Sequence, residues 1–107
     1  MRFDSVLSEA LLSEAGQVLA ILAERVGFRS GQVVRAFDDP GQWCLVTEWE
    51  SVGAYRRALG SYAVKAGATP LLSRARPEPS AFEPLAVAGP GGPVTVVGSD
   101  RSIASRT

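Results

Sequence analysis

The sequence predicts an α+β fold in which helices cover one face of an antiparallel sheet. The spacing of apolar residues alternates along the chain between a strand period and a helix period. It gives the order strand, helix, strand, strand, helix, strand. This order is the split βαβ, ferredoxin-like arrangement βαββαβ, with a four-stranded antiparallel sheet. The strand expected at 42–50 is apolar on both sides, which indicates that both faces of the sheet are covered.

The first half of the chain carries the clearest elements. Residues 2–6 alternate and predict a short strand. Apolar residues at helical spacing predict a helix over 8–26, and Gly27 fits the left-handed position that ends many helices. Strands at 30–37 and 42–50 flank a Pro-Gly turn, so they form a hairpin.

The second half contains weaker signals. Ser51 can cap a helix over 52–66, which Gly60 weakens and can break. A Thr-Pro pair precedes a short helical turn at 71–76. The last strand is expected at 81–88, with its proline marking an edge or a bulge.

Composition limits the classes of partner. We expect residues 1–88 to form one domain and residues 89–107 to form a Gly/Pro/Ser-rich tail.

Basic and acidic residues number 11 each among 107, so we expect no nucleic-acid partner, because nucleic-acid-binding proteins carry a basic excess. No stretch has the length of a membrane span, no leader is visible, and a single Cys forms no intramolecular disulfide. We expect a cytoplasmic protein without membrane contact.

One face of the expected sheet has no helix to cover it. Trp43, Leu45 and Trp49 are the candidates for that face, and they would expose a larger apolar patch than monomers usually tolerate. A second copy can cover the patch, and two such sheets packed face to face form a closed dimeric α/β barrel. The sequence therefore predicts a homodimer.

The chain contains no His, which excludes Ser-His-Asp and Cys-His nucleophile systems and a structural zinc site. The Gly-Pro-Gly-Gly segment at 89–92 lacks the Lys-Ser/Thr that a phosphate cradle needs. We expect no metal and no cofactor.

Three segments, taken in order, resemble one family. They are Gly27-Phe28 after the first helix, Asp38-Asp39-Pro40 in the hairpin, and Glu48-Trp49-Glu50-Ser51 before the second helix. Together they resemble the antibiotic biosynthesis monooxygenase domain, over roughly residues 2–88. The resemblance implies a dimeric α+β barrel. It also implies cofactor-independent oxygenation of a phenolic or aromatic small molecule.

The chain departs from the family pattern in two places. Met1 lies almost inside the first strand, which is longer in the family, so the native start lies upstream or the strand is trimmed. The haem-degrading members use Asn, Trp and His, and only Trp49 matches here. The expected His position falls near Ala58 or Leu59, neither of which ligates iron. Haem degradation by that plan is not expected.

Four residues on one face of the second hairpin strand are candidates for substrate binding: Trp43, Leu45, Thr47 and Trp49. Each Trp either stacks on a planar aromatic substrate or packs in the core. Tyr55 either donates a hydrogen bond to a substrate oxygen or lies on the apolar stripe of its helix.

Arg35 is the second candidate for a catalytic role, since it lies inside an apolar strand. It either stabilises a phenolate in the barrel or is an edge charge that pairs with Glu48. A four-residue turn would pair it with Cys44, away from the Trp side chains, and one bulge would reverse that.

Two functions from different classes fit these observations. The first is a cofactor-independent monooxygenase acting on a phenolic small molecule. The alternative is a non-catalytic dimeric barrel that binds a small apolar ligand or serves as a dimerisation module, which the absence of His favours.

Overall fold

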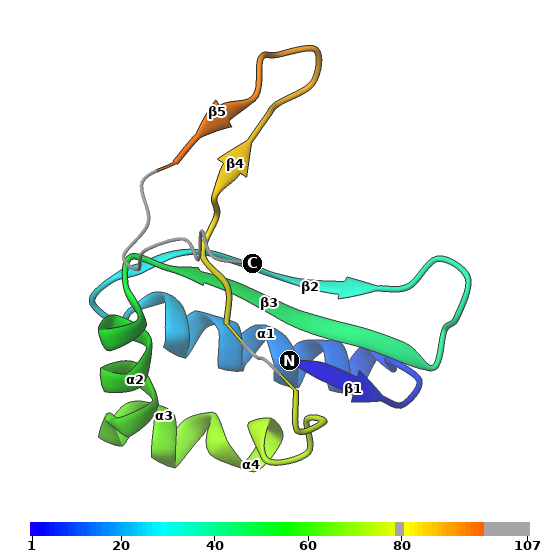
Figure 1. Cartoon of the computed structure of the whole chain (residues 1–107). Helices are drawn as coiled ribbons and strands as arrows, with labels where there is room; N and C mark the ends of the chain where they lie inside the picture. The colour runs from blue at the N-terminus through cyan, green and yellow to red at the C-terminus, as the bar shows by residue number, and fades with distance from the viewer. Residues whose placement is uncertain (79–80, 98–107) are drawn as a thin grey trace.

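The computed structural model describes residues 1–78 and 81–97. Helices lie on one side of an antiparallel sheet, and a small hairpin projects on the other side (Figure 1). The elements in chain order are β1 (Arg2–Asp4), α1 (Glu9–Ala23), β2 (Phe28–Arg35), β3 (Gln42–Trp49), α2 (Val52–Gly60), α3 (Tyr62–Gly67), α4 (Thr69–Leu72), β4 (Ala86–Val87) and β5 (Thr95–Val96).

The main sheet has three strands in the order β1-β3-β2, all antiparallel. The expected four-stranded sheet is therefore wrong for the described residues, because the segment 81–88 does not add a fourth strand. The outer edge of β1 is instead contacted by Arg76, whose backbone N–H donates to the Arg2 carbonyl at 2.8 Å. Phe82 makes a single parallel bridge to Glu48, and the chain then leaves the sheet to form the β4–β5 hairpin.

Helix α1 forms where the apolar spacing predicts it. The Ser8 hydroxyl accepts from the Leu11 N–H at 3.1 Å and caps the first turn. Ala15, Val18 and Leu22 recur at helical spacing and are buried against the sheet. The helix ends at Ala23, three residues earlier than expected, and within the described residues no helix is long and apolar enough to cross a membrane.

The second helical region is divided, as the glycine at 60 indicated. Ser61 adopts an extended conformation, with φ −72° and ψ 152°, and interrupts the helical hydrogen-bond ladder between α2 and α3. Its hydroxyl donates to the Ala58 carbonyl at 2.7 Å and accepts from the Val64 N–H at 3.4 Å. One serine therefore ends α2 and caps α3.

The two faces of β3 differ from the expectation. Trp43, Leu45, Thr47 and Trp49 are buried, and the three apolar members belong to the core cluster with the helices. The expectation that Trp43, Leu45 and Trp49 form the open face is wrong. The large rings fill the space between sheet and helices, where they bury the most apolar area. The open face carries Cys44, Val46 and Glu48.

The pairing of β2 with β3 also settles the side on which Arg35 lies. Arg35 pairs with Trp43, because the loop between the strands is one residue longer than expected. A bulge lies at the opposite end of β2, between Phe28 and Ser30. Arg35 therefore lies on the Trp43 side of the sheet, at its exposed end. The residue opposite Cys44 is Val34.

A Gly27→Ala variant is expected to lose roughly 2 kcal/mol of unfolding free energy. Gly27 has φ +91°, and a Cβ there would overlap the Ala54 side chain at the start of α2. Urea denaturation followed by far-UV circular dichroism measures the loss.

Gly16→Ala is the matched control for this substitution. Gly16 lies within α1, and outside its chain neighbours and the backbone of its own helix no atom lies within 4 Å of the position that its Cβ would occupy. Alanine there should raise the unfolding free energy by about 0.5–1 kcal/mol. Equal effects of the two substitutions would contradict a special role for the backbone at Gly27.

Candidate functional site

A pocket of about 220 Å³ lies at one end of the space between sheet and helices. Strand β1 and the turn after it supply three of the lining residues, and α1, β3, α4 and the turn after α4 supply one each. The lining residues are Phe3, Asp4, Ser5, Leu11, Trp43, Leu71 and Arg74.

Two stacked rings form the apolar wall of the pocket. The Phe3 and Trp43 rings lie nearly parallel, with centroids 4.1 Å apart and an interplanar angle of 9°. The Trp43 Nε1–H donates to the Ser5 hydroxyl at 3.1 Å, which fixes the orientation of the indole. The pocket is thus bounded on one side by a buried aromatic pair, with a hydroxyl beside it.

Charged side chains lie on the rim of the pocket. The Arg74 Nη2 donates to Glu14 at 2.7 Å. The Asp4 Oδ1 accepts from the Gln42 amide at 2.6 Å, and its Oδ2 accepts from Arg76. The hydrogen bond from Arg76, helped by that from Gln42, lowers the pKa of the Asp4 carboxyl below its ordinary value. Asp4 is therefore an ionised anchor at neutral pH and a weak base.

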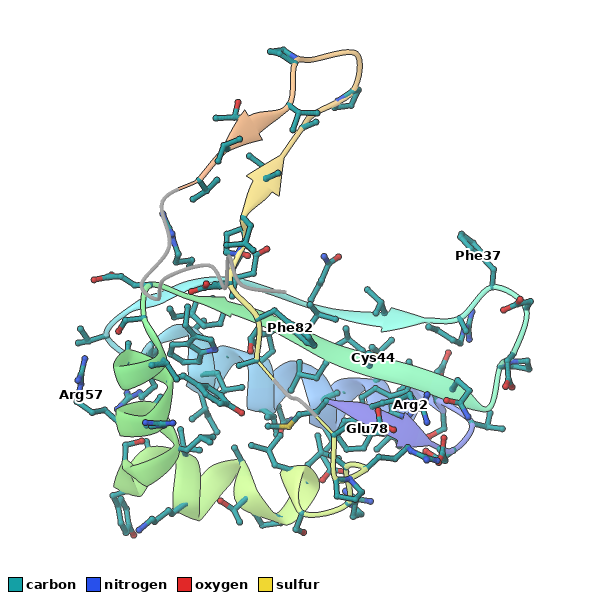
Figure 2. All side chains as sticks on the ribbon, in the orientation of Figure 1. Arg2, Phe37, Cys44, Arg57, Glu78 and Phe82 are labelled. Atoms are coloured by element: carbon teal, nitrogen blue, oxygen red, sulfur yellow. The ribbon has the colours of Figure 1, made fainter. Side chains whose placement is uncertain are left out.

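The Asp4 contacts belong to a small ion-pair network. Arg76 pairs with both Asp4 and Glu78, and Glu78 also accepts from Arg2 at 3.0 Å. Arg2 and Glu78 lie close together beside β1 in Figure 2. The network holds the segment after α4 against β1, and that segment continues from the pocket residue Arg74.

A second aromatic cluster lies around Trp49. The Trp49 Nε1–H donates to the Thr47 hydroxyl at 2.9 Å. The Phe28 ring meets the Trp49 ring edge-on, with the ring centroids 5.2 Å apart. The centroid of the Tyr55 ring lies 5.6 Å from that of Trp49, and the two ring planes are inclined by 50°. This cluster joins the start of β2 to β3 and α2, and none of its members lines the pocket.

The structure brings together few of the residues that the sequence singled out. Trp43 lines the pocket, whereas Leu45, Thr47 and Trp49 are buried in the layer between sheet and helices. Tyr55 packs beside Trp49, and Arg35 is exposed at the end of β2, so neither catalytic candidate lines this pocket.

Sequence reasoning missed Ser5 and Arg74. Ser5 follows Phe3 at strand spacing, so the two share a side, which the alternation at 2–6 could have indicated. Arg74 lies three residues after Leu71, on the same side of a helical turn. Neither belongs to a recognisable motif.

The chemistry that these residues provide is polar and aromatic. Among residues 1–78 and 81–97, no group of three or more His, Cys, Asp or Glu side chains could hold a metal ion. The arrangement offers a small pocket with an aromatic side, a hydroxyl and a guanidinium.

The helix-covered antiparallel sheet and the pocket between its layers define an α+β protein of the ferredoxin-like type. The family model described as antibiotic biosynthesis monooxygenase matches residues 4–69, more than half of the chain. The chain belongs to this family. The match includes Ser5 and Trp43 and ends before Arg74. No curated protein matches the chain.

The Asp4→Asn variant should lose stability at neutral pH and little at about pH 2. Folding lowers the pKa of the Asp4 carboxyl below its ordinary value of 3.8. The ionised carboxylate therefore stabilises the folded state at pH values above 3.8, and this stabilisation is lost as the pH falls through the lowered pKa. Urea denaturation of wild type and variant at both pH values measures the difference.

Asp38→Asn in the exposed β2–β3 loop is the control and should change stability little at either pH. If Asp4→Asn destabilised the protein equally at both pH values, the loss would come from packing, and the charge-assisted bond to Arg76 would not be its cause.

Proposed function

We propose that this protein binds a compact phenolic aromatic molecule in the pocket and oxygenates it without a cofactor. The observation that carries the proposal is the stacked Phe3–Trp43 wall with Ser5 and Arg74 beside it, in a member of this family. The volume of about 220 Å³ lies below the ~300–1,000 Å³ of common ligand pockets, which favours a molecule of one or two rings.

The pocket supports the formation of a phenolate. The Phe3–Trp43 side of the pocket is apolar, so an electrostatic interaction beside it is stronger than in bulk solvent. A guanidinium carries five N–H donors, and Arg74 directs Nη2 to Glu14. We propose that Arg74 stabilises the phenolate oxygen and that the Ser5 hydroxyl positions it.

The proposed reaction balances without an external reductant. The phenol loses its proton, and the carbon para to the phenolate oxygen forms a bond to molecular oxygen, giving a peroxide. The O–O bond then breaks as the ring carbon loses its hydrogen. The products are a quinone and one water molecule. The substrate supplies all the electrons, which is the chemistry that the family resemblance implies.

The alternative is a ligand-binding protein without turnover. The carboxyl in the pocket is a weak base, because Arg76 and Gln42 occupy its oxygens and its pKa is lowered. The chain has no His to take the phenol proton. This observation favours binding alone, and oxygen consumption distinguishes the two functions.

We also propose that the protein is a cytoplasmic homodimer, in which a second copy covers the open face of the sheet. Val34, Cys44 and Val46 place apolar side chains on that face beside the polar Gln32, and they support the dimeric barrel that the family resemblance implies.

A Trp49→Phe variant keeps Trp43 as its single Trp, and its fluorescence should change on titration with a naphthol, because Trp43 lines the pocket. The matched Trp43→Phe variant keeps Trp49, which lies outside this pocket, and should show little change. The same response from both variants would place the ligand elsewhere.

Oxygen uptake with a naphthol tests the reaction. Wild type should consume one oxygen molecule per quinone formed, and Arg74→Gln should lower kcat by about 100-fold, as loss of an anion-stabilising donor does. Arg56→Gln, on the exposed side of α2, is the control. Binding without uptake above the uncatalysed rate would establish the non-catalytic alternative.

A further inference from the structure

Two of the residues that line the pocket are charged, and each has a partner of opposite charge. Asp4 accepts from Arg76, and Arg74 donates from Nη2 to Glu14 at 2.7 Å. Neither Arg76 nor Glu14 is a lining residue of this pocket. The rim of the pocket therefore carries two ion pairs, and the positive charge of Arg74 is balanced from outside the pocket.

Glu14 is held beside the pocket by helix α1. Leu11 lines the pocket, and Glu14 follows it by three residues, so the two side chains are neighbours on the surface of the helix. Arg74 lies in the turn after α4, and its side chain reaches from that turn to α1. The ion pair thus joins two helical segments that both contribute residues to the wall of the pocket, Leu11 from α1 and Leu71 from α4.

The pairing with Glu14 affects the hydrogen-bond donors of Arg74 and its charge differently. A guanidinium has five N–H groups, and Nη2 bonds to Glu14, so donors remain for an oxygen atom of a ligand. The charge, by contrast, is balanced by a carboxylate in direct contact with it. An anion beside Arg74 is attracted by the guanidinium and repelled by the adjacent carboxylate. An uncharged hydroxyl needs only a donor and does not experience this repulsion.

We propose that Glu14 makes the pocket selective for uncharged phenols over aromatic carboxylates, because it balances the charge of Arg74. This rests on the proposed function and narrows its class of ligand. A phenol is uncharged at neutral pH when it enters the pocket, whereas an aromatic carboxylate enters as an anion. Glu14 acts through Arg74 and needs no contact with the ligand.

The exposure of the ion pair sets the size of the expected effect. The side chains of Arg74 and Glu14 are 55% and 42% exposed, so solvent weakens the interaction between their charges and those of a ligand. We therefore expect an effect of about fivefold on the affinity for an anion at low ionic strength. The effect should disappear at high ionic strength, because the screening length falls to about 3 Å in 1 M salt.

The test compares a naphthol with the corresponding naphthoate. The full chain carrying Trp49→Phe serves as the reference protein, and the fluorescence of Trp43 reports binding. The reference protein should bind the naphthol more tightly than the naphthoate. Adding Glu14→Gln should tighten naphthoate binding about fivefold in a buffer of about 10 mM ionic strength, and should change naphthol binding by less than about twofold.

Two further measurements separate charge from structure. The effect of Glu14→Gln on naphthoate should fall below about twofold in 1 M sodium chloride, which a purely structural role of Glu14 would not produce. Glu14→Asp keeps the charge and should keep the preference for the naphthol. Far-UV circular dichroism checks that each variant is folded.

Glu24→Gln is the matched control, because it removes the same charge beyond the end of α1, about 15 Å further along the helix axis. It should leave both affinities unchanged. Equal effects of Glu24→Gln and Glu14→Gln on naphthoate binding would overturn the proposal, since net charge would then explain the selectivity.

The outcomes distinguish this proposal from the proposed function. If Glu14→Gln weakens binding of both ligands by the same factor, or changes neither, the selectivity proposal is wrong and binding of a phenol stands. If the Trp43 fluorescence of the reference protein responds to neither ligand, both proposals are wrong.

Discussion

The stack of Phe3 on Trp43 is the contact on which the rest of the structure depends. Strand β1 has only three residues, and its ladder with β3 is too short to hold it alone. The ring stack and the bond from the Trp43 indole to Ser5 add side-chain contacts to that ladder. They place β1 against the helix layer and create the pocket wall in the same step. Stability and the proposed ligand pocket therefore share the same residues.

The parts of the fold that local rules control are predictable from the sequence. Helix α1 follows from its apolar spacing and its Ser8 cap, and the β2–β3 hairpin follows from its Pro-Gly turn. The two sides of β3 could not be distinguished, because both are apolar. Ring volume decides between them, since Trp43 and Trp49 fit only the deep space under the helices. The sequence did not indicate that the segment 81–88 would stay outside the main sheet. At the outer edge of β1 the backbone N–H of Arg76 bonds to the Arg2 carbonyl instead.

The site was partly visible in the sequence for a related reason. Trp43 stands out because Trp is rare and lies on a strand. Ser5 and Arg74 are common residue types in short connecting segments, and only the three-dimensional structure brings them to the same rim. Tyr55 and Arg35 looked suitable by residue type, but α2 and the end of β2 hold them away from this pocket. The aromatic character of a candidate site could be inferred from the sequence, whereas the residues that line this pocket required the topology.

The bulge between Phe28 and Ser30 has a consequence for how the protein avoids uncontrolled assembly. Strand β2 is an edge of the three-stranded sheet, and eight residues of unprotected edge could recruit a further strand. The bulge interrupts the regular spacing of backbone donors and acceptors, and Arg29 and Arg35 place charge near the two ends of the strand. An incoming strand would meet both obstacles. Growth by edge addition, the route to fibres, is thereby disfavoured, while the flat side of the sheet stays free for packing.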